Sequence, residues 1–450
     1  MDSETMKSYN VIVEDGSGCL FQSMISKEYT YILTAKHLFE GNRINQNGRP
    51  GSYSKNEGDK INISQIIFNG NNWTKKPIDF IFQRNINYFP HNEADIAILK
   101  IGYIEGFDAI FSDYEIDGKI DYELCGFPNI RRGNNQSVID EYTSHAIERF
   151  IAPSDYSHIA QVFQGFNKNN IEGMSGGPFL KISGSRISIL GIQSRMISTQ
   201  LPAGQIGFVP MKYFDEIVNY EDNKNELTPF LPYYMQSFDF LRKEILKLEE
   251  ALSQNFKSKI NNVITEQVKL IGVCPNELYT SKIRKSLLAN SENESILLTK
   301  EIWISWFEYL IVLCVLLEKK IDLQEVEHFF NKKRLIHSGT DGSWIEILPE
   351  ILRSDLKHLE KNGTVVVSTK KPPSGRKRIQ KGYIEDIANP MINELTIDKV
   401  SELNKIEEII HIKAFEIDCI IQNEKTLDGF SNFQIKEMIE ELKKKIYEFF

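Results

Sequence analysis

A serine lies within a glycine-rich hexapeptide, GMSGGP, at residues 173–178. A serine that attacks a carbonyl group needs its hydroxyl held out of the regular backbone ladder, with N–H groups nearby to receive the charge that develops on the substrate oxygen. Glycines on both sides of Ser175 permit such a turn. Because glycine-rich turns around a serine also occur as plain hairpin connections, the hexapeptide alone is compatible with catalysis and with a structural turn.

A histidine and an aspartate next to two apolar runs could complete the chemistry. His37 closes the segment TAKH, directly after the apolar run 31–33, where a buried strand would end. Asp95 stands directly before the apolar run 96–99, at the start of another expected strand. Serine, histidine and aspartate together supply a nucleophile, a general base and a carboxylate that orients the imidazole. A structural interpretation is open as well, since polar residues at strand ends also cap turns.

The three segments, in the chain order TAKH, DIAIL and GMSGGP, resemble the His, Asp and Ser motifs of trypsin-like serine proteases with the chymotrypsin fold. The α/β-hydrolases and subtilisins carry the same residue types in other orders. The resemblance covers roughly residues 10–215 and implies that His37 is the general base, that Asp95 fixes its tautomer and that Ser175 is the nucleophile. It also implies an oxyanion hole made by the backbone N–H groups of Gly173 and Ser175.

Two further residues bear on this assignment. Asp79 is the other candidate for the acid, and it ranks below Asp95 because the apolar run that follows it, 80–82, is shorter. Met174 occupies the position at which digestive proteases of the family carry an aspartate that pairs with a newly cleaved N-terminus. We therefore do not expect activation by N-terminal cleavage, and we expect control by another domain or a partner.

The resemblance also implies a pocket for a protein substrate. Its base falls at Asn169 and its walls at Ser194, Arg195, Met196 and Gly207. No aspartate there indicates a preference for lysine or arginine in the substrate. Arg195 could pair with an acidic side chain of the substrate or could simply be solvated.

Composition limits the class of protein. The chain has 450 residues, of which 41% are hydrophobic and 26% charged, as in ordinary globular proteins of two or three domains. The net charge of −9 argues against general attraction to nucleic acid or anionic lipid. Five scattered cysteines do not form a disulfide pattern, and the N-terminus lacks a signal peptide. We expect a cytoplasmic protein, with no membrane association, metal or cofactor.

The expected fold class is α+β with several domains. Residues 8–218 contain short apolar runs separated by turn residues, which predict an all-β double barrel, and the resemblance implies that this barrel is of the chymotrypsin type. Residues 219–236, with several prolines, are expected to be a connector. Residues 237–450 are expected to form a mainly α-helical domain that regulates the first or docks to a partner.

Three segments define this second domain. Apolar residues between Leu241 and Val263 recur at spacings of three and four, which predicts one long amphipathic helix, as a bundle core or a coiled-coil seam. The run 302–317 carries Glu308 and is too short to cross a bilayer, so it predicts a buried helix. The run 364–368 predicts a strand.

Polar residues of the second domain give weaker signals. The basic loop 370–378 could contact phosphates or could be solvated, and direct nucleic-acid contact is the less favoured of the two. His337, His358 and His411 lack the neighbouring cysteines or carboxylates typical of a metal site.

A second resemblance rests on the segment IHS at 336–338, residues 344–359, and the segment VVVST at 365–369 with the prolines after it. These are similar to the C-terminal domain of effectors in bacterial three-component anti-phage systems, the Lamassu type among them. The resemblance implies an SMC-like ATPase complex as partner. Together the two resemblances imply a regulated serine endopeptidase that acts as a defence effector. The alternative is a catalytically silent scaffold that binds peptides or partner proteins, and the intact triad favours the enzyme.

Overall fold

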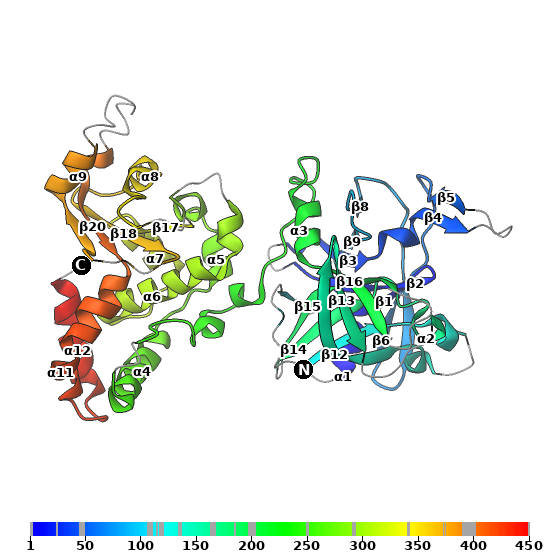
Figure 1. The fold of residues 1–450 in the computed structure, drawn as a ribbon, viewed down its shortest axis with the longest axis horizontal. Helices are drawn as coiled ribbons and strands as arrows, with labels where there is room; N and C mark the ends of the chain where they lie inside the picture. Colours follow the sequence, from blue (N-terminus) through cyan, green and yellow to red (C-terminus); the bar gives the residue numbers. More distant parts are fainter. Residues whose placement is uncertain are drawn as a thin grey trace. The chain divides into compact units, whose positions relative to one another are not determined.

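The computed structural model divides the chain into two compact units, Met1–Tyr233 and Tyr234–Phe450 (Figure 1). The described residues are 3–23, 26–44, 50–105, 111–113, 116, 121–133, 137–162, 168–183, 186–196, 204–248, 252–289, 294–339, 343–371, 373, 375–388 and 402–448. Strands dominate the first unit, and most of the helices belong to the second (Figure 1).

The first unit starts with a seven-stranded antiparallel sheet. Across this sheet the strands are β7 (Trp73–Ile78), β6 (Ile63–Phe68), β1 (Asn10–Val13), β2 (Gly16–Phe21), β3 (Tyr29–Thr34), β9 (Ala97–Gly102) and β8 (Tyr88–Pro90). Successive side chains of a strand point to opposite faces. Leu20 and Ile32 pack into one buried cluster, whereas Phe21 and Leu33 pack into another, which also contains residues of the second sheet. Both faces of the sheet are therefore buried.

The second sheet closes into a barrel. Its strands are β15 (Arg186–Met196), β14 (Pro178–Ser183), β11 (Asp121–Gly126), β12 (Thr143–Ser154), β13 (Ser157–Val162) and β16 (Gln205–Pro210), and β16 pairs again with β15. The short strand β10 (Phe111–Ser112) pairs with the outside edge of β15. Inside the barrel the rings of Phe179 and Phe208 stack with their centroids 4.2 Å apart. A closed barrel leaves no strand edge to template aggregation.

The expected double barrel is present only in part. One of the two sheets is a closed barrel, whereas the ladders described for the other leave β7 and β8 as open edges. Short apolar runs bounded by turn residues indicate buried strands, but they do not indicate whether the sheet that these strands form closes on itself. The segment 40–60 contains a two-stranded hairpin of β4 (Glu40–Ile44) and β5 (Pro50–Ser54).

The segment expected to be a connector, 219–236, packs largely onto the first unit. It follows helix α3 (Lys212–Asn219). Phe230 is fully buried, and its ring centroid lies 4.7 Å from that of Phe21 and 5.5 Å from that of Tyr31. The hydroxyl of Tyr31 accepts a hydrogen bond from the N–H of Thr228 at 2.6 Å. Prolines indicated an extended segment but gave no information on what it contacts.

The second unit contains a four-stranded sheet that the sequence revealed only in part. Its order is β17 (Lys333–Ser338), β18 (Gly363–Thr369), β20 (Ile406–His411) and β19 (Arg378–Gln380), and the first three are parallel. The predicted strand 364–368 is confirmed as part of β18. The strands β17 and β20 were missed because each contains buried polar residues, among them Arg334, His337, Glu408 and His411. Neither therefore shows the continuous apolar run that is typical of a buried parallel strand.

Helices cover both faces of this sheet (Figure 1). In the second unit, the described helices of six or more residues are, in chain order, α4 (Gln254–Val268), α5 (Pro275–Thr280), α6 (Lys300–Leu317), α7 (Leu323–Phe330), α8 (Leu348–Arg353), α9 (Lys381–Ala388), a π-helix (Phe415–Ile420) and α12 (Ile435–Tyr447). The short helix α11 (Glu424–Asp428) precedes α12. Helix α6 confirms the buried helix expected at 302–317 and contacts β17 and β18. Among the described residues, no helix is long and apolar enough to cross a membrane.

The long helix expected from Leu241 to Val263 is wrong for its first half. Leu246 adopts a left-handed conformation with φ of 43°, and the regular helix α4 begins only after its cap, Ser253. The N–H of Leu246 donates to the Glu308 carboxylate of α6 at 3.2 Å. This buried carboxylate is also paired with Lys413 at 2.6 Å. A tertiary acceptor thus replaces the helical one, which local spacing cannot indicate.

Two buried histidines make the second unit sensitive to acid. Burial lowers the pKa of His337 to about 4 and that of His411 to about 3, so both are neutral in the native protein near pH 7. In the unfolded chain they titrate near pH 6.5. The stability that the neutral histidines give the native state is therefore fully present above pH 6.5, and it is lost as the pH falls toward 4. We predict that each histidine lowers the free energy of unfolding by about 2 kcal/mol between pH 7 and pH 5.

Urea unfolding followed by tryptophan fluorescence at the two pH values measures this loss. His337→Asn should reduce the pH dependence, whereas His328→Gln, a change at an exposed position, should leave it unchanged. Equal pH dependence in all three proteins would contradict the assignment.

Phe230 tests whether the predicted connector is part of the first unit's core. Phe230→Ala removes a fully buried ring from the cluster of Phe21 and Tyr31. Large-to-small changes of this kind cost about 3–5 kcal/mol. We predict that the free energy of unfolding of the first unit falls by that amount, measured from its transition in calorimetry of the full chain. An unchanged midpoint for both transitions would show that the segment is a free connector.

Candidate active site

His37 and Asp95 lie together because β3 and β9 are neighbours. Thr34, at the end of β3, is paired with Ala97, at the start of β9, so the residues just beyond meet at one edge of the sheet. The Oδ2 of Asp95 lies 2.6 Å from Nδ1 of His37, and its Oδ1 accepts the backbone N–H of His37 at 2.8 Å. A carboxylate in this position favours a proton on Nδ1, which leaves Nε2 as the proton acceptor.

Asp79, the other candidate acid, does not share this position. Its carboxylate is 96% exposed and lies 3.6 Å from Lys60 Nζ. Among the described contacts, only Asp95 brings a carboxylate to His37.

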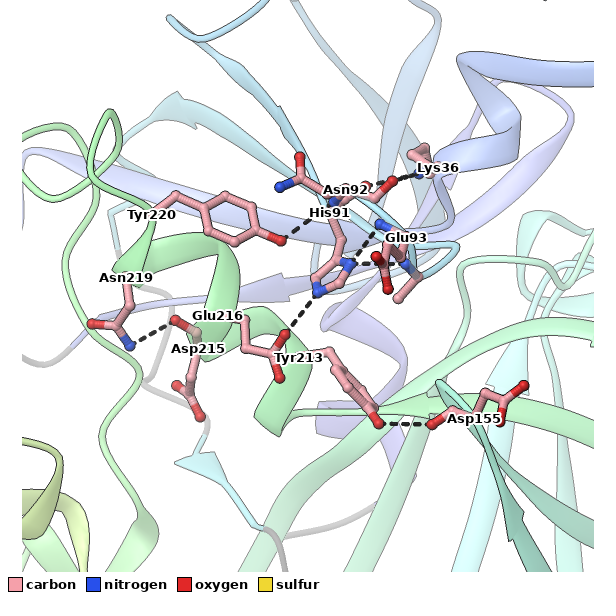
Figure 2. A network of polar contacts seen from close by, with 11 residues as sticks. Lys36, His91, Asn92, Glu93, Asp155, Tyr213, Asp215, Glu216, Asn219 and Tyr220 are labelled. Atoms are coloured by element: carbon pink, nitrogen blue, oxygen red, sulfur yellow. Dashed lines mark hydrogen bonds and ion pairs between the residues drawn. The ribbon is translucent and has the colours of Figure 1, made fainter.

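The loop that carries Asp95 is anchored by a histidine that the sequence pattern did not single out. His91 is 3% exposed, and its Nδ1 accepts the N–H groups of Glu93 at 3.0 Å and Ala94 at 2.7 Å (Figure 2). Because Nδ1 accepts twice, the proton is on Nε2, which donates to Glu216 Oε2 at 3.0 Å. The only sequence signal was a histidine four residues before the candidate acid.

This anchor joins three elements. Glu216 belongs to helix α3, and the His91 carbonyl accepts a hydrogen bond at 2.7 Å from Lys36, the neighbour of the candidate base (Figure 2). Tyr220, after α3, accepts the N–H of Asn92 at 3.3 Å. The loop before the candidate acid is therefore held by the segment before the candidate base and by α3.

In the turn around Ser175, two backbone N–H groups have no carbonyl acceptor among the described residues. Gly173 and Gly176 have φ angles of 96° and 90°, a region that glycine adopts without strain. The N–H groups of Met174, Gly176 and Gly177 donate to backbone carbonyls at 2.9, 2.8 and 2.7 Å. Within the described part of the chain, no acceptor is found for the N–H of Gly173 or Ser175. This is the pair that the sequence predicts for an oxyanion hole.

The turn packs directly on the first sheet. The Ser175 carbonyl accepts the N–H of Ser17 in β2 at 2.7 Å. A Cβ on Gly176 would lie 1.9 Å from the Ser17 carbonyl, so any other residue would force the two sheets apart. Thr34, three residues before His37, donates to the same Ser17 carbonyl at 2.8 Å. Ser17 of β2 thereby bonds both to the turn of Ser175, through its N–H, and to the end of the strand before the candidate base, through its carbonyl.

The structure therefore brings together the candidate acid and the candidate base and packs the turn of Ser175 against their sheet. Ser175 is partly exposed, as are His37 and Asp95. Among the described hydrogen bonds, none joins Ser175 Oγ to His37 Nε2. Such bonds are often long in proteins without substrate and tighten in the substrate complex.

The expected pocket residues fall on three elements. Ser194 and Arg195 lie in β15, Gly207 in β16, and Arg195 is the register partner of Gly207. The carbonyl of Gln193 accepts the N–H of Gly176 at 2.8 Å, which places this part of β15 beside the turn. Asn169 lies in helix α2 (Lys168–Ile171), and its side chain, like those of Arg195 and Met196, falls outside the described residues. The two interpretations of Arg195 stay open.

Polar residues of the second unit are engaged in local contacts. His337 Nδ1 is hydrogen-bonded to Ser368 Oγ at 2.7 Å, and His411 Nε2 to Thr369 Oγ1 at 2.9 Å. No metal-binding group of three ligands is found among the described residues. In the basic loop, Lys377 pairs with Asp418 at 3.2 Å and Arg378 with Glu408 at 2.6 Å. These pairs reduce the positive charge that the loop can present.

Part of the chain matches a known protein family. Residues 208–421 match the family model described as C-terminal domain 4 of the ABC-three component (ABC-3C) systems. No curated protein matches the chain. The matched region is slightly less than half of the chain and starts within β16, so it includes α3 and most of the second unit. This part of the chain is similar to a domain of ABC-3C systems, which suggests a role in anti-phage defence within a multicomponent assembly.

Proposed function

We propose that the first unit is a serine endopeptidase that cleaves a protein substrate through Ser175, His37 and Asp95. The observation that carries this proposal is the bond of 2.6 Å between Asp95 and His37 Nδ1, with the turn of Ser175 packed on the same sheet. A carboxylate, an imidazole with a free Nε2 and a serine beside two unbonded N–H groups are the components of acyl transfer.

The reaction proceeds in two halves. Ser175 Oγ attacks the carbonyl carbon of the scissile peptide, its proton passes to His37 Nε2, and the carbonyl electron pair moves to the oxygen. The N–H groups of Gly173 and Ser175 stabilise that oxyanion. When the carbon–nitrogen bond breaks, His37 gives its proton to the departing amine. Water then attacks the acyl ester and gives a proton to His37. The bond between the acyl carbon and Ser175 Oγ breaks, His37 returns the proton to Ser175 Oγ, and the carboxylic acid product leaves. Asp95 stabilises the imidazolium in both halves.

The partner proposal rests on the domain match. The match is to a domain of a three-component system, and the resemblance noted in the sequence implies an SMC-like ATPase as partner. We therefore propose that the region 208–421 links the protease to such a complex in the cytoplasm. Helix α3 belongs to this region and holds the loop of Asp95 through Glu216 and His91. A partner that moved α3 would act on the acid of the triad.

The alternative is a catalytically silent scaffold that binds peptides or partner proteins. One observation favours it: the described hydrogen bonds do not include one between Ser175 and His37. The two candidates differ in whether Ser175 reacts.

Labelling with a fluorophosphonate decides between them. We predict that the purified chain, alone or with its partners, is labelled at Ser175, and that Ser175→Ala abolishes labelling without changing the melting temperature. Ser17→Ala is not a suitable control, because that hydroxyl contacts the turn. Ser54→Ala, a change in the β4–β5 hairpin, should label like the wild type. Absence of labelling under both conditions would favour the scaffold.

The acid is tested by Asp95→Asn. The asparagine amide donates N–H groups to Nδ1 of His37 and so favours the imidazole tautomer that carries its proton on Nε2. In that tautomer, Nε2 cannot accept the proton of Ser175. We predict a fall in the labelling rate of about 10⁴-fold near pH 7. Asp79→Asn removes the rival carboxylate and should have no effect on the rate. A comparable loss in both variants would contradict the role given to Asp95.

A further inference from the structure

The direction of the Gly173 N–H is set by the peptide that joins Glu172 to Gly173. In a planar trans peptide the N–H and the C=O point in opposite directions. The Glu172 carbonyl accepts the N–H of Asn129 at 2.6 Å. The Gly173 N–H therefore points away from Asn129 and keeps no carbonyl partner among the described residues.

The next carbonyl of the turn is held by two side chains. The Gly173 oxygen accepts Arg132 Nη2 at 2.9 Å and Ser17 Oγ at 2.8 Å. The hydroxyl of Ser17 in turn accepts the N–H of Phe127 at 3.0 Å. Both peptides that flank Gly173 are thus tied by their oxygens.

Arg132 connects the turn to two other segments. Its guanidinium donates to the carbonyl of Phe127, at 2.6 Å from Nη2 and 2.9 Å from Nε, and to that of Gly16 at 2.8 Å from Nη2. Its Nη1 donates to the Glu14 carbonyl at 3.2 Å. Burial lowers the pKa of Arg132 to about 10, against the opposing effect of Asp15 and Glu141, so the group stays charged at neutral pH. A planar cation with five donors can bridge several carbonyls at once, which lysine cannot.

The residue after Gly173 cannot hold the carbonyls of the turn as Arg132 does. The Met174 side chain is apolar and fully buried in the core of the barrel, so it offers the turn no charged contact. Arg132 and Asn129, by contrast, belong to one short segment, in which the Arg132 N–H donates to the Asn129 carbonyl at 3.1 Å. Displacement of Arg132 would therefore also release the contact that holds the Glu172 carbonyl.

We propose that Arg132 is a positioning residue for the oxyanion hole: by holding the Gly173 carbonyl and the segment of Asn129, it keeps the Gly173 N–H directed toward the substrate oxygen. This inference rests on the proposed protease function. Without Arg132 the Glu172–Gly173 peptide is free to rotate, which would place a carbonyl where the oxyanion develops. Glycine permits that rotation because it has no Cβ.

The test compares Arg132→Met and Arg132→Lys with Phe230→Ala in the full chain. Phe230→Ala destabilises the same unit without contacting the turn, so it controls for loss of stability. We expect Arg132→Met to lower the limiting rate of fluorophosphonate labelling by about 100-fold, with little change in the concentration for half-maximal rate. Arg132→Lys should retain more activity, and added guanidinium ion at low millimolar concentration should partly restore a further variant, Arg132→Gly.

A second measurement reports the orientation of the peptide without any reaction. Hydrogen exchange of the Asn129 amide, followed by mass spectrometry, should be slow in the wild type and in Phe230→Ala but fast in Arg132→Met, because that amide loses the Glu172 carbonyl. Labelling and exchange unchanged in Arg132→Met, or changed equally in Phe230→Ala, would overturn the inference. If the wild type is not labelled, the proposed function fails and the exchange measurement alone decides the role of Arg132.

Discussion

The close contact of Gly176 with strand β2 is the constraint on which the candidate site depends. A Cβ at this position would overlap the Ser17 carbonyl, so the turn of the barrel can lie against the first sheet only with glycine there. The Ser17 carbonyl accepts a hydrogen bond from Thr34 Oγ1, and the Ser17 N–H donates to the Ser175 carbonyl. A single residue of β2 thus fixes the turn of Ser175 and the end of the strand that leads to His37.

Around this contact, the backbone polar groups of the turn are satisfied selectively. Buried carbonyls and N–H groups are costly when they lack partners. In the turn, the carbonyls of Glu172, Gly173 and Ser175 are bonded to Asn129, Arg132 and Ser17. The N–H groups of Gly173 and Ser175 are the two for which the described residues offer no acceptor. In the proposed mechanism, these two N–H groups direct positive dipoles into one small region before a substrate binds, as a preorganised oxyanion hole requires.

The loop that carries Asp95 is held by a residue of the region that matches the ABC-3C domain. His91 ties the loop of Asp95 to Glu216 in α3, and the match to the ABC-3C domain begins at residue 208, before that helix. The region related to a known domain therefore includes an element that is structurally part of the first unit. The boundary of the family match and the boundary between compact units, at Tyr233 and Tyr234, do not coincide. In our proposal, a partner of the matched domain would influence Asp95 through α3, which belongs both to the matched region and to the first unit.

Residue types and local pattern by themselves determined much of this protein. The segments around His37, Asp95 and Ser175 indicated their elements because apolar runs mark strands and glycines mark turns. The buried helix at 302–317 and the strand at 364–368 were also predicted, since continuous apolar runs bounded by polar residues signal burial. Only the tertiary structure decided that one sheet closes and the other stays open, that Leu246 interrupts a helical pattern to bond Glu308, and that Arg132 and His91 support the site. Those features depend on partners far apart in the chain, and a pattern of nearest neighbours carries no information about which distant group will supply a hydrogen bond.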